Sequence, residues 1–105
     1  MDDDLTIRAT RDGSTAIVAA SGEIDLSNVG ELRAAVTAAA EDCDRLRLDL
    51  SEIEFIDSTG LGGLLELRST LRARNVTLEI VAGDGPVRQA VEITGLAELL
   101  APAGS

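Results

Sequence analysis

The segment with the clearest potential for chemistry is Asp57-Ser58-Thr59-Gly60, which sets a carboxylate beside two hydroxyl groups. Apolar residues at strand spacing precede this segment, and leucines at helical spacing follow it. We therefore expect a hydroxyl group at the N-terminus of a helix, where Ser58 would accept a hydrogen bond from a free backbone N–H group. The same position tolerates a phosphate, because the helix dipole and the free N–H groups attract anions. Ser58 is thus either an ordinary helix cap or a phosphate acceptor.

The chain lacks the side chains that usually activate a serine. It contains no histidine and no lysine, and Cys43 is its only cysteine. These absences exclude a Ser-His-Asp triad, a Cys–His pair and a lysine-containing phosphate loop. A lone cysteine supports neither an internal disulfide nor a structural zinc site, and we expect Cys43 to be a loop or packing residue. The sequence therefore predicts no enzyme activity, no metal ion and no cofactor.

Charge and composition narrow the range of partners. Acidic residues outnumber basic ones by 19 to 9, the formal net charge is −10, and aromatic residues make up 1% of the chain. Such a chain repels nucleic-acid phosphates and anionic lipids, and it has few rings on which bases could stack. We expect no direct binding of nucleic acid and no membrane insertion. The acidity either complements a basic partner surface or only aids solubility.

The length and hydrophobic content suit one compact domain. The chain has 105 residues, of which 45% are hydrophobic. We predict a single domain over residues 1–105, with tails at 1–4 and 101–105. The acidic N-terminus has no apolar signal-peptide region, and no apolar run reaches the length of a membrane span. The expected location is the cytoplasm.

Hydrophobic periodicity predicts alternating strands and helices on either side of the hydroxyl segment. The predicted strands cover residues 5–10, 15–20, 45–50, 76–81 and 96–100. The first predicted helix begins near Val29, the second follows Asp57-Ser58-Thr59-Gly60 with its apolar pattern from Leu61, and the third begins at Pro86. The first helix extends to about residue 40, with Asn28 and Glu31 at the spacing of a capping box and Ser27 as the alternative cap. This order predicts an α/β fold with a mixed sheet that opens with a hairpin.

Three stretches of the sequence together resemble the STAS family. They are Gly22-Glu23-Ile24-Asp25, the run from Asp49 through Asp57-Ser58-Thr59-Gly60-Leu61-Gly62, and Ile93-Thr94-Gly95-Leu96. The similarity is greatest to the anti-sigma factor antagonists and covers about residues 5–100. Many family members carry a further helix after the last strand, whereas residues 101–105 show no helical pattern.

The resemblance implies a STAS-like mixed β-sheet whose helices pack mainly on one face, and it implies a regulatory role. The unphosphorylated antagonist binds an anti-sigma factor that is a serine kinase, and this releases the sigma factor. Phosphorylation at Ser58, or at Thr59 as the second choice, switches binding off, and a PP2C-type phosphatase resets the switch. The partner-binding residues implied by motif position are Asp25, Asp57, Ser58, Thr59, Gly60, Leu61 and Gly62.

Two other functions stay open at this point. One is a STAS subunit of a membrane transport complex that acts as a structural partner of an ATPase. The other is an aspartic protease, because Asp57-Ser58-Thr59-Gly60 is similar to the Asp-Thr/Ser-Gly loop of those enzymes, although an extra residue separates Asp from Gly. A further question concerns Gly60, Gly62 and Gly63, which either allow a partner backbone to approach Ser58 or allow tight packing of the helix on the sheet.

Overall fold

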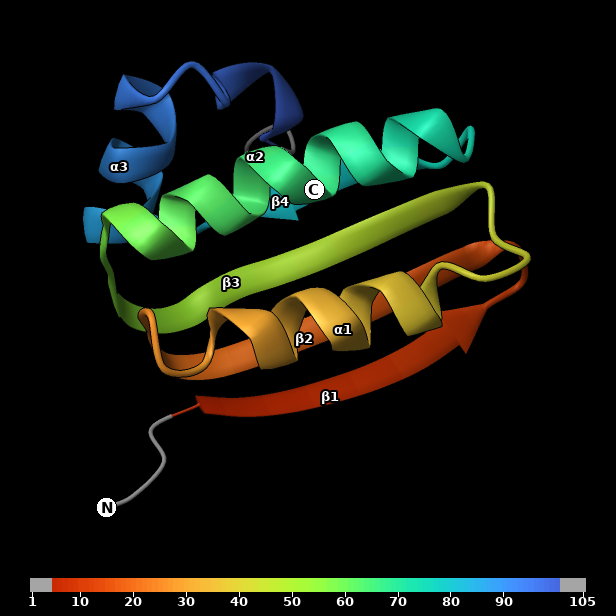
Figure 1. Cartoon of the computed structure of the whole chain (residues 1–105), viewed down its shortest axis with the longest axis horizontal. Helices are drawn as coiled ribbons and strands as arrows, with labels where there is room; N and C mark the ends of the chain where they lie inside the picture. The colour runs from red at the N-terminus through yellow and green to blue at the C-terminus, as the bar shows by residue number, and fades with distance from the viewer. Residues whose placement is uncertain (1–4, 101–105) are drawn as a thin grey trace.

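Four strands form one mixed sheet in the computed structural model, which describes residues 5–100 (Figure 1). The strands lie in the order of the chain: β1 (Leu5–Asp12), β2 (Thr15–Ile24), β3 (Arg45–Ile56) and β4 (Thr77–Val81). The hairpin of β1 and β2 is antiparallel, and β2, β3 and β4 run parallel to one another. Gly13 closes the hairpin with a φ of 64°, a conformation that glycine adopts without strain. The predicted α/β class and the opening hairpin are confirmed.

Helix α1 (Val29–Ala39) connects β2 to β3, and helix α2 (Ser58–Ala73) connects β3 to β4. Helix α3 (Pro86–Ile93) and a short 3-10 helix, η1 (Ala97–Leu99), follow β4. Figure 1 shows α1 and α2 side by side across the same face of the sheet. Strand residues at alternate positions, such as Val18, Leu46 and Leu48, are fully buried in one continuous core with residues of these helices. The period-two pattern of β3 therefore places one face of the sheet against α1 and α2.

Strands β2 and β3 extend farther than their hydrophobic alternation predicts. β2 continues to Ile24 and β3 to Ile56, and their pairing shifts register between Ala19 and Ser21 and again between Gly22 and Glu23. Such irregularities break a strict alternation of apolar and polar residues, so the pattern alone ends each strand too early. The extension brings the ends of both strands to the segment that contains Ser58.

The predicted fifth strand at residues 96–100 is wrong. Leu96 is fully buried, and its carbonyl accepts a hydrogen bond from the N–H of Leu99, which makes a 3-10 turn. The leucines at these two positions have the spacing of a helix rather than that of a strand. Only Leu100 bridges to the sheet, through a single pairing with Ile80 of β4.

Further expectations from the sequence concern Cys43, membrane spans, metal sites and the two tails. Cys43 is buried, as expected of a packing residue. Within residues 5–100, no helix combines the length and the apolar character needed to cross a membrane, and no cluster of three potential metal ligands is found. The predicted tails at 1–4 and 101–105 lie outside the described residues.

Candidate functional site

The carboxyl ends of β2 and β3 and the N-termini of α1 and α2 meet at one end of the molecule (Figure 1, left). Ile24 pairs with Ile56 at the ends of the two parallel strands. Immediately beyond this pair, the N–H of Asp57 donates to the carbonyl of Ile24 over 3.2 Å. Asp25 and Asp57 therefore leave the sheet next to each other, and Ser58 follows Asp57 directly. The carboxyl edge of parallel strands is where α/β folds usually carry their functional residues.

The N-cap of α2 is Asp57, and the prediction that Ser58 caps the helix is wrong. The Asp57 backbone is extended, and its Oδ1 atom accepts a hydrogen bond of 2.9 Å from the N–H of Gly60. The same oxygen accepts a bond of 2.6 Å from the Thr59 hydroxyl. Aspartate caps a helix as well as serine does, and here it precedes serine in the chain. Ser58 thereby becomes the first helical residue.

The hydroxyl groups of Ser58 and Thr59 have different surroundings. Both residues are exposed, but the Thr59 hydroxyl donates to Asp57, whereas no hydrogen-bond partner of the Ser58 hydroxyl occurs within residues 5–100. Ser27 and Ser51 repeat the arrangement of Thr59, because each donates to an aspartate two positions earlier over 2.6 Å. A hydroxyl two residues after an aspartate is thus held by the chain itself. Among the described residues, nothing holds the hydroxyl of Ser58 in this way.

The hydrogen bonds at the cap keep Asp57 ionised. The Thr59 hydroxyl has the largest effect, the N–H of Gly60 contributes next, and together they hold the pKa of Asp57 below its ordinary value of 3.8. Because the pKa is lower in the folded state, ionised Asp57 stabilises the fold above the unfolded value. That contribution is lost as the pH falls through the folded pKa.

The variant Thr59→Val tests this account of the cap. We expect the pKa of Asp57 to rise toward 3.8, since the largest cause of its depression is removed. NMR titration of the side-chain carboxyl carbon measures the change. Ser58→Ala is the control and leaves the pKa of Asp57 at its wild-type value. A Thr59→Val variant with an unchanged Asp57 pKa contradicts the assignment.

The loop between β2 and α1 is organised by Asn28, which is 5% exposed. Its Oδ1 atom accepts from the N–H of Asp25, and its Nδ2 group donates to the carbonyl of Glu23, both over 2.9 Å. The predicted capping box of Asn28 and Glu31 is wrong, because the Asn28 side chain makes no bond to the helix it precedes. The amide instead has two partners in the preceding loop. This role has no sequence signal beyond an asparagine before a helix.

The glycines at the start of α2 have two different roles. A Cβ atom at Gly60 would lie 2.7 Å from Ile56 Cγ1, and one at Gly63 would lie 2.4 Å from Val29 Cγ2. Both positions therefore need glycine for tight packing. A Cβ atom at Gly62 would meet nothing within 4 Å. The sequence offered tight packing or room for a partner backbone as explanations for these glycines. Tight packing applies to Gly60 and Gly63, whereas Gly62 faces open space outside the helix.

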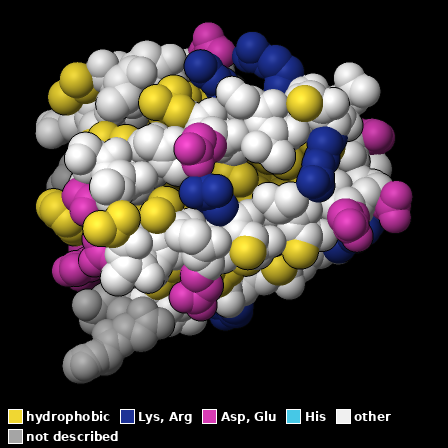
Figure 2. All heavy atoms as spheres, viewed as in Figure 1, with side chains coloured by type: hydrophobic (Ala, Val, Ile, Leu, Met, Phe, Trp, Pro, Cys, Tyr) yellow, Lys and Arg dark blue, Asp and Glu magenta, His cyan; other side chains and the backbone are white. Residues whose placement is uncertain are grey.

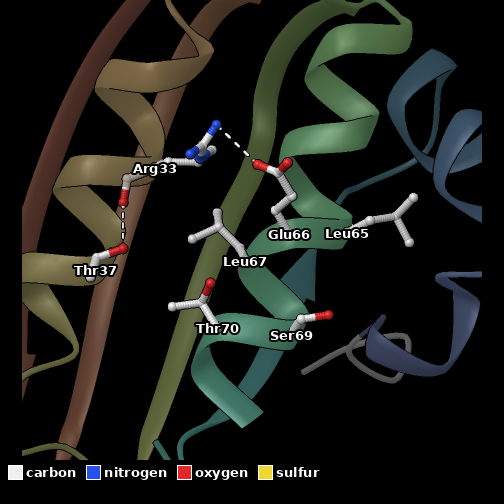
Figure 3. Close-up of a pocket in the computed structure, with 7 residues that line it drawn as sticks. All are labelled: Arg33, Thr37, Leu65, Glu66, Leu67, Ser69 and Thr70. Carbon is white, nitrogen blue, oxygen red and sulfur yellow. Dashed lines mark hydrogen bonds and ion pairs between the residues drawn. The ribbon is translucent and has the colours of Figure 1, made fainter. Parts of the chain in front are cut away.

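A shallow groove of about 520 Å³ lies between α1 and α2 (Figure 3). Arg33 of α1 forms an ion pair of 3.0 Å with Glu66 of α2, and both side chains are largely exposed. Leu65 and the hydroxyl groups of Ser69 and Thr70 line the α2 side. None of the residues from Asp25 or from Asp57 to Gly62 lines this groove. The candidate site is therefore the exposed end of the sheet rather than the interhelical groove.

Comparisons with known proteins were made for the sequence and for the fold. The family model described as STAS domain matches residues 6–103. The anti-sigma-B factor antagonist of Staphylococcus aureus is 30% identical over 97 residues, which cover 91% of this chain and 90% of that protein. The crystal structure of an anti-sigma factor antagonist from Mycobacterium paratuberculosis is 29% identical, with a TM-score of 0.83, and the match covers 95% of this chain and 87% of the other.

A more distant structure shares the fold. The phosphorylated form of the Bacillus cell fate determinant SpoIIAA has a TM-score of 0.74 and 19% identity, and the match covers 95% of this chain and 93% of the other. The sheet order and the positions of the helices are thus common to proteins whose sequences have diverged widely.

Proposed function

The chain belongs to the STAS domain family, in which it is an anti-sigma factor antagonist, and we propose that phosphorylation of Ser58 switches its partner binding. The unphosphorylated chain binds an anti-sigma factor that is also a serine kinase, and the sigma factor is released. The kinase then phosphorylates Ser58 and dissociates, and a PP2C-type phosphatase restores the starting state. In this cytoplasmic cycle the chain is a ligand and a substrate and does no catalysis of its own.

One observation carries the choice of Ser58. It is the first residue of α2, it is exposed, and its hydroxyl has no partner in the described part of the chain. A phosphate on this residue would sit at a helix N-terminus, where negative charge is favoured, so the domain remains folded when modified. Thr59 is the weaker candidate because its hydroxyl must first leave Asp57.

The other two functions are less well supported. The match covers almost the whole length of relatives that are named as antagonists. This coverage favours the antagonist role over that of a subunit of a transport complex. The protease alternative requires an aspartate in a β-rich framework. Asp57 is instead the cap of a 16-residue helix, and its carboxylate is occupied by Thr59 and Gly60.

Mapping the phosphate tests the proposal. Purified anti-sigma factors of the source organism are incubated with ATP and with the wild-type chain, Ser58→Ala or Thr59→Ala, and the product is analysed by mass spectrometry. We expect one phosphate on the wild type and on Thr59→Ala, and none on Ser58→Ala. If Ser58→Ala were phosphorylated at the normal rate, the assignment of Ser58 as acceptor would be wrong, and Thr59 would be the next candidate.

A further inference from the structure

Leu26 is a large apolar side chain that the fold leaves in solvent. It lies between Asp25 and Ser27 at the turn after β2, and it is 75% exposed. A single exposed leucine needs no explanation on a protein surface. Leu26 differs from an ordinary exposed leucine in the way its loop is held.

Hydrogen bonds fix the backbone on both sides of Leu26. The Asp25 carboxylate accepts from the N–H and the hydroxyl of Ser27, at 3.0 and 2.6 Å. The Asp25 carbonyl accepts from the N–H groups of Asn28 and Val29, at 3.2 and 2.9 Å. The buried Asn28 amide ties the same loop to the carbonyl of Glu23. An apolar side chain presented on a fixed loop loses little conformational entropy when it is buried by a partner, which is the property of a binding anchor.

The end of the molecule that carries Leu26 is acidic, and basic side chains of the described residues do not neutralise it. Residues 22–32 and 52–62, which form this end of the molecule, contain no arginine. Ion pairs within residues 5–100 involve none of the carboxylates of these two stretches. These carboxylates are Glu23, Asp25, Glu31, Glu52, Glu54 and Asp57. In Figure 2, acidic and hydrophobic side chains lie side by side at the end where α1 and α2 begin.

We propose that Leu26 is the apolar anchor of the antagonist, and that it inserts into an apolar depression rimmed by arginine or lysine side chains on the anti-sigma factor. This inference rests on the proposed function. Unpaired carboxylates around an apolar centre complement a basic rim around an apolar pocket. The carbonyl of Ile24, two residues before Leu26, accepts a hydrogen bond from the N–H of Asp57, one residue before Ser58. Leu26 and Ser58 therefore lie at the same edge of the sheet, where one partner can contact both. Phosphate transfer and docking then use one continuous surface.

Substitution of Leu26 tests the anchor. Binding of the wild type, Leu26→Ser and Leu26→Met to the purified anti-sigma factor that binds the wild type is measured by calorimetry, at low and at moderate salt. We expect Leu26→Ser to bind at least tenfold more weakly and Leu26→Met to stay within threefold. Ile93→Ser is the matched control, because Ile93 is 83% exposed but lies on α3, and we expect it to change affinity less than twofold. Wild-type binding is expected to weaken as salt rises.

The binding measurements distinguish a wrong assignment of the Leu26 anchor from a wrong proposed function. If Leu26→Ser binds as tightly as the wild type while Ser58→Asp does not bind, the anchor is overturned and the switch stands. Equal losses in Leu26→Ser and Ile93→Ser also overturn the anchor. Wild-type affinity that is independent of salt overturns the basic rim. If no anti-sigma factor of the source organism binds the wild type, the proposed function fails as well.

Discussion

Ser58→Asp is expected to weaken binding of the anti-sigma factor more than tenfold, whereas Ser58→Ala keeps the wild-type affinity. The aspartate adds a negative charge at the first residue of α2, directly beside the ionised cap Asp57. Calorimetry with the purified anti-sigma factor measures the two affinities. A phosphate adds more charge than aspartate, about −1.5 to −2 at pH 7, so the modified chain should lose at least as much affinity.

The repulsion between Asp57 and a negative charge at position 58 is large enough to change the affinity for the partner tenfold. Two like charges about 4 Å apart repel by roughly 4 kcal/mol at an effective dielectric constant of 20, and by less where water screens them. In the free chain, solvent screens much of this repulsion, and the favourable interaction of negative charge with the helix dipole offsets part of the rest. A partner that covers the site removes the solvent, and a difference of about 1.4 kcal/mol between the free and bound states is a factor of ten in affinity.

Ser69→Asp is the matched control for this prediction. Ser69 is also exposed and also lies on α2, but it is about 16 Å farther along the helix axis. The variant carries the same added charge without placing it at the site, and its affinity is expected to stay within twofold of the wild type. If Ser69→Asp loses as much affinity as Ser58→Asp, the effect is one of net charge, and the local switch is contradicted.

Much of the fold could be predicted from local periodicity. The alternation of leucines at 46, 48 and 50 identifies β3, and the strand–helix order with its opening hairpin defines the mixed sheet. The strand predicted at residues 96–100 was wrong because a short apolar run such as Leu96 to Leu100 suits either a strand or a helix. Tertiary contacts decide between a strand and a helix here, and a local sequence pattern carries no information about those contacts.

The start of the second long helix was predicted where the structure has it, but the roles of the residues around this start were not. Spacing placed hydroxyls at the start of α2, yet the competition between Asp57 and Ser58 for the cap depends on backbone angles that the sequence does not display. The function of Asn28 depends on the carbonyl of Glu23, a partner supplied by the tertiary path of the loop. The different roles of the glycines likewise follow from neighbours on β2, β3 and α1 rather than from α2 itself.

The glycine at position 63 is expected to be the most sensitive point of the helix layer. Gly63→Ala should lower the free energy of unfolding by about 1–3 kcal/mol, because its Cβ atom would lie 2.4 Å from Val29 Cγ2 and force α1 and α2 apart. The better helix propensity of alanine, worth about 1 kcal/mol, offsets only part of this cost. Chemical denaturation measures the change.

Gly62→Ala is the matched control, since it makes the same chemical change one residue away. A Cβ atom there meets nothing within 4 Å, so only the gain in helix propensity remains. We expect an increase in the free energy of unfolding of about 0.5–1 kcal/mol. Equal effects of the two alanines would mean that α1 and α2 do not pack at the distance seen in the structure.

The double variant Val29→Ala with Gly63→Ala identifies the contact itself. Val29→Ala alone loses buried methyl groups and should destabilise the fold. Combined with Gly63→Ala, it provides the space that the new methyl group needs, so the double variant should be more stable than the sum of the single effects predicts. Additivity to within about 0.5 kcal/mol would contradict the contact. Because Val29 follows the Leu26 loop directly and Gly63 belongs to the helix that begins at Ser58, this contact joins the two elements that carry the proposed anchor and the proposed switch.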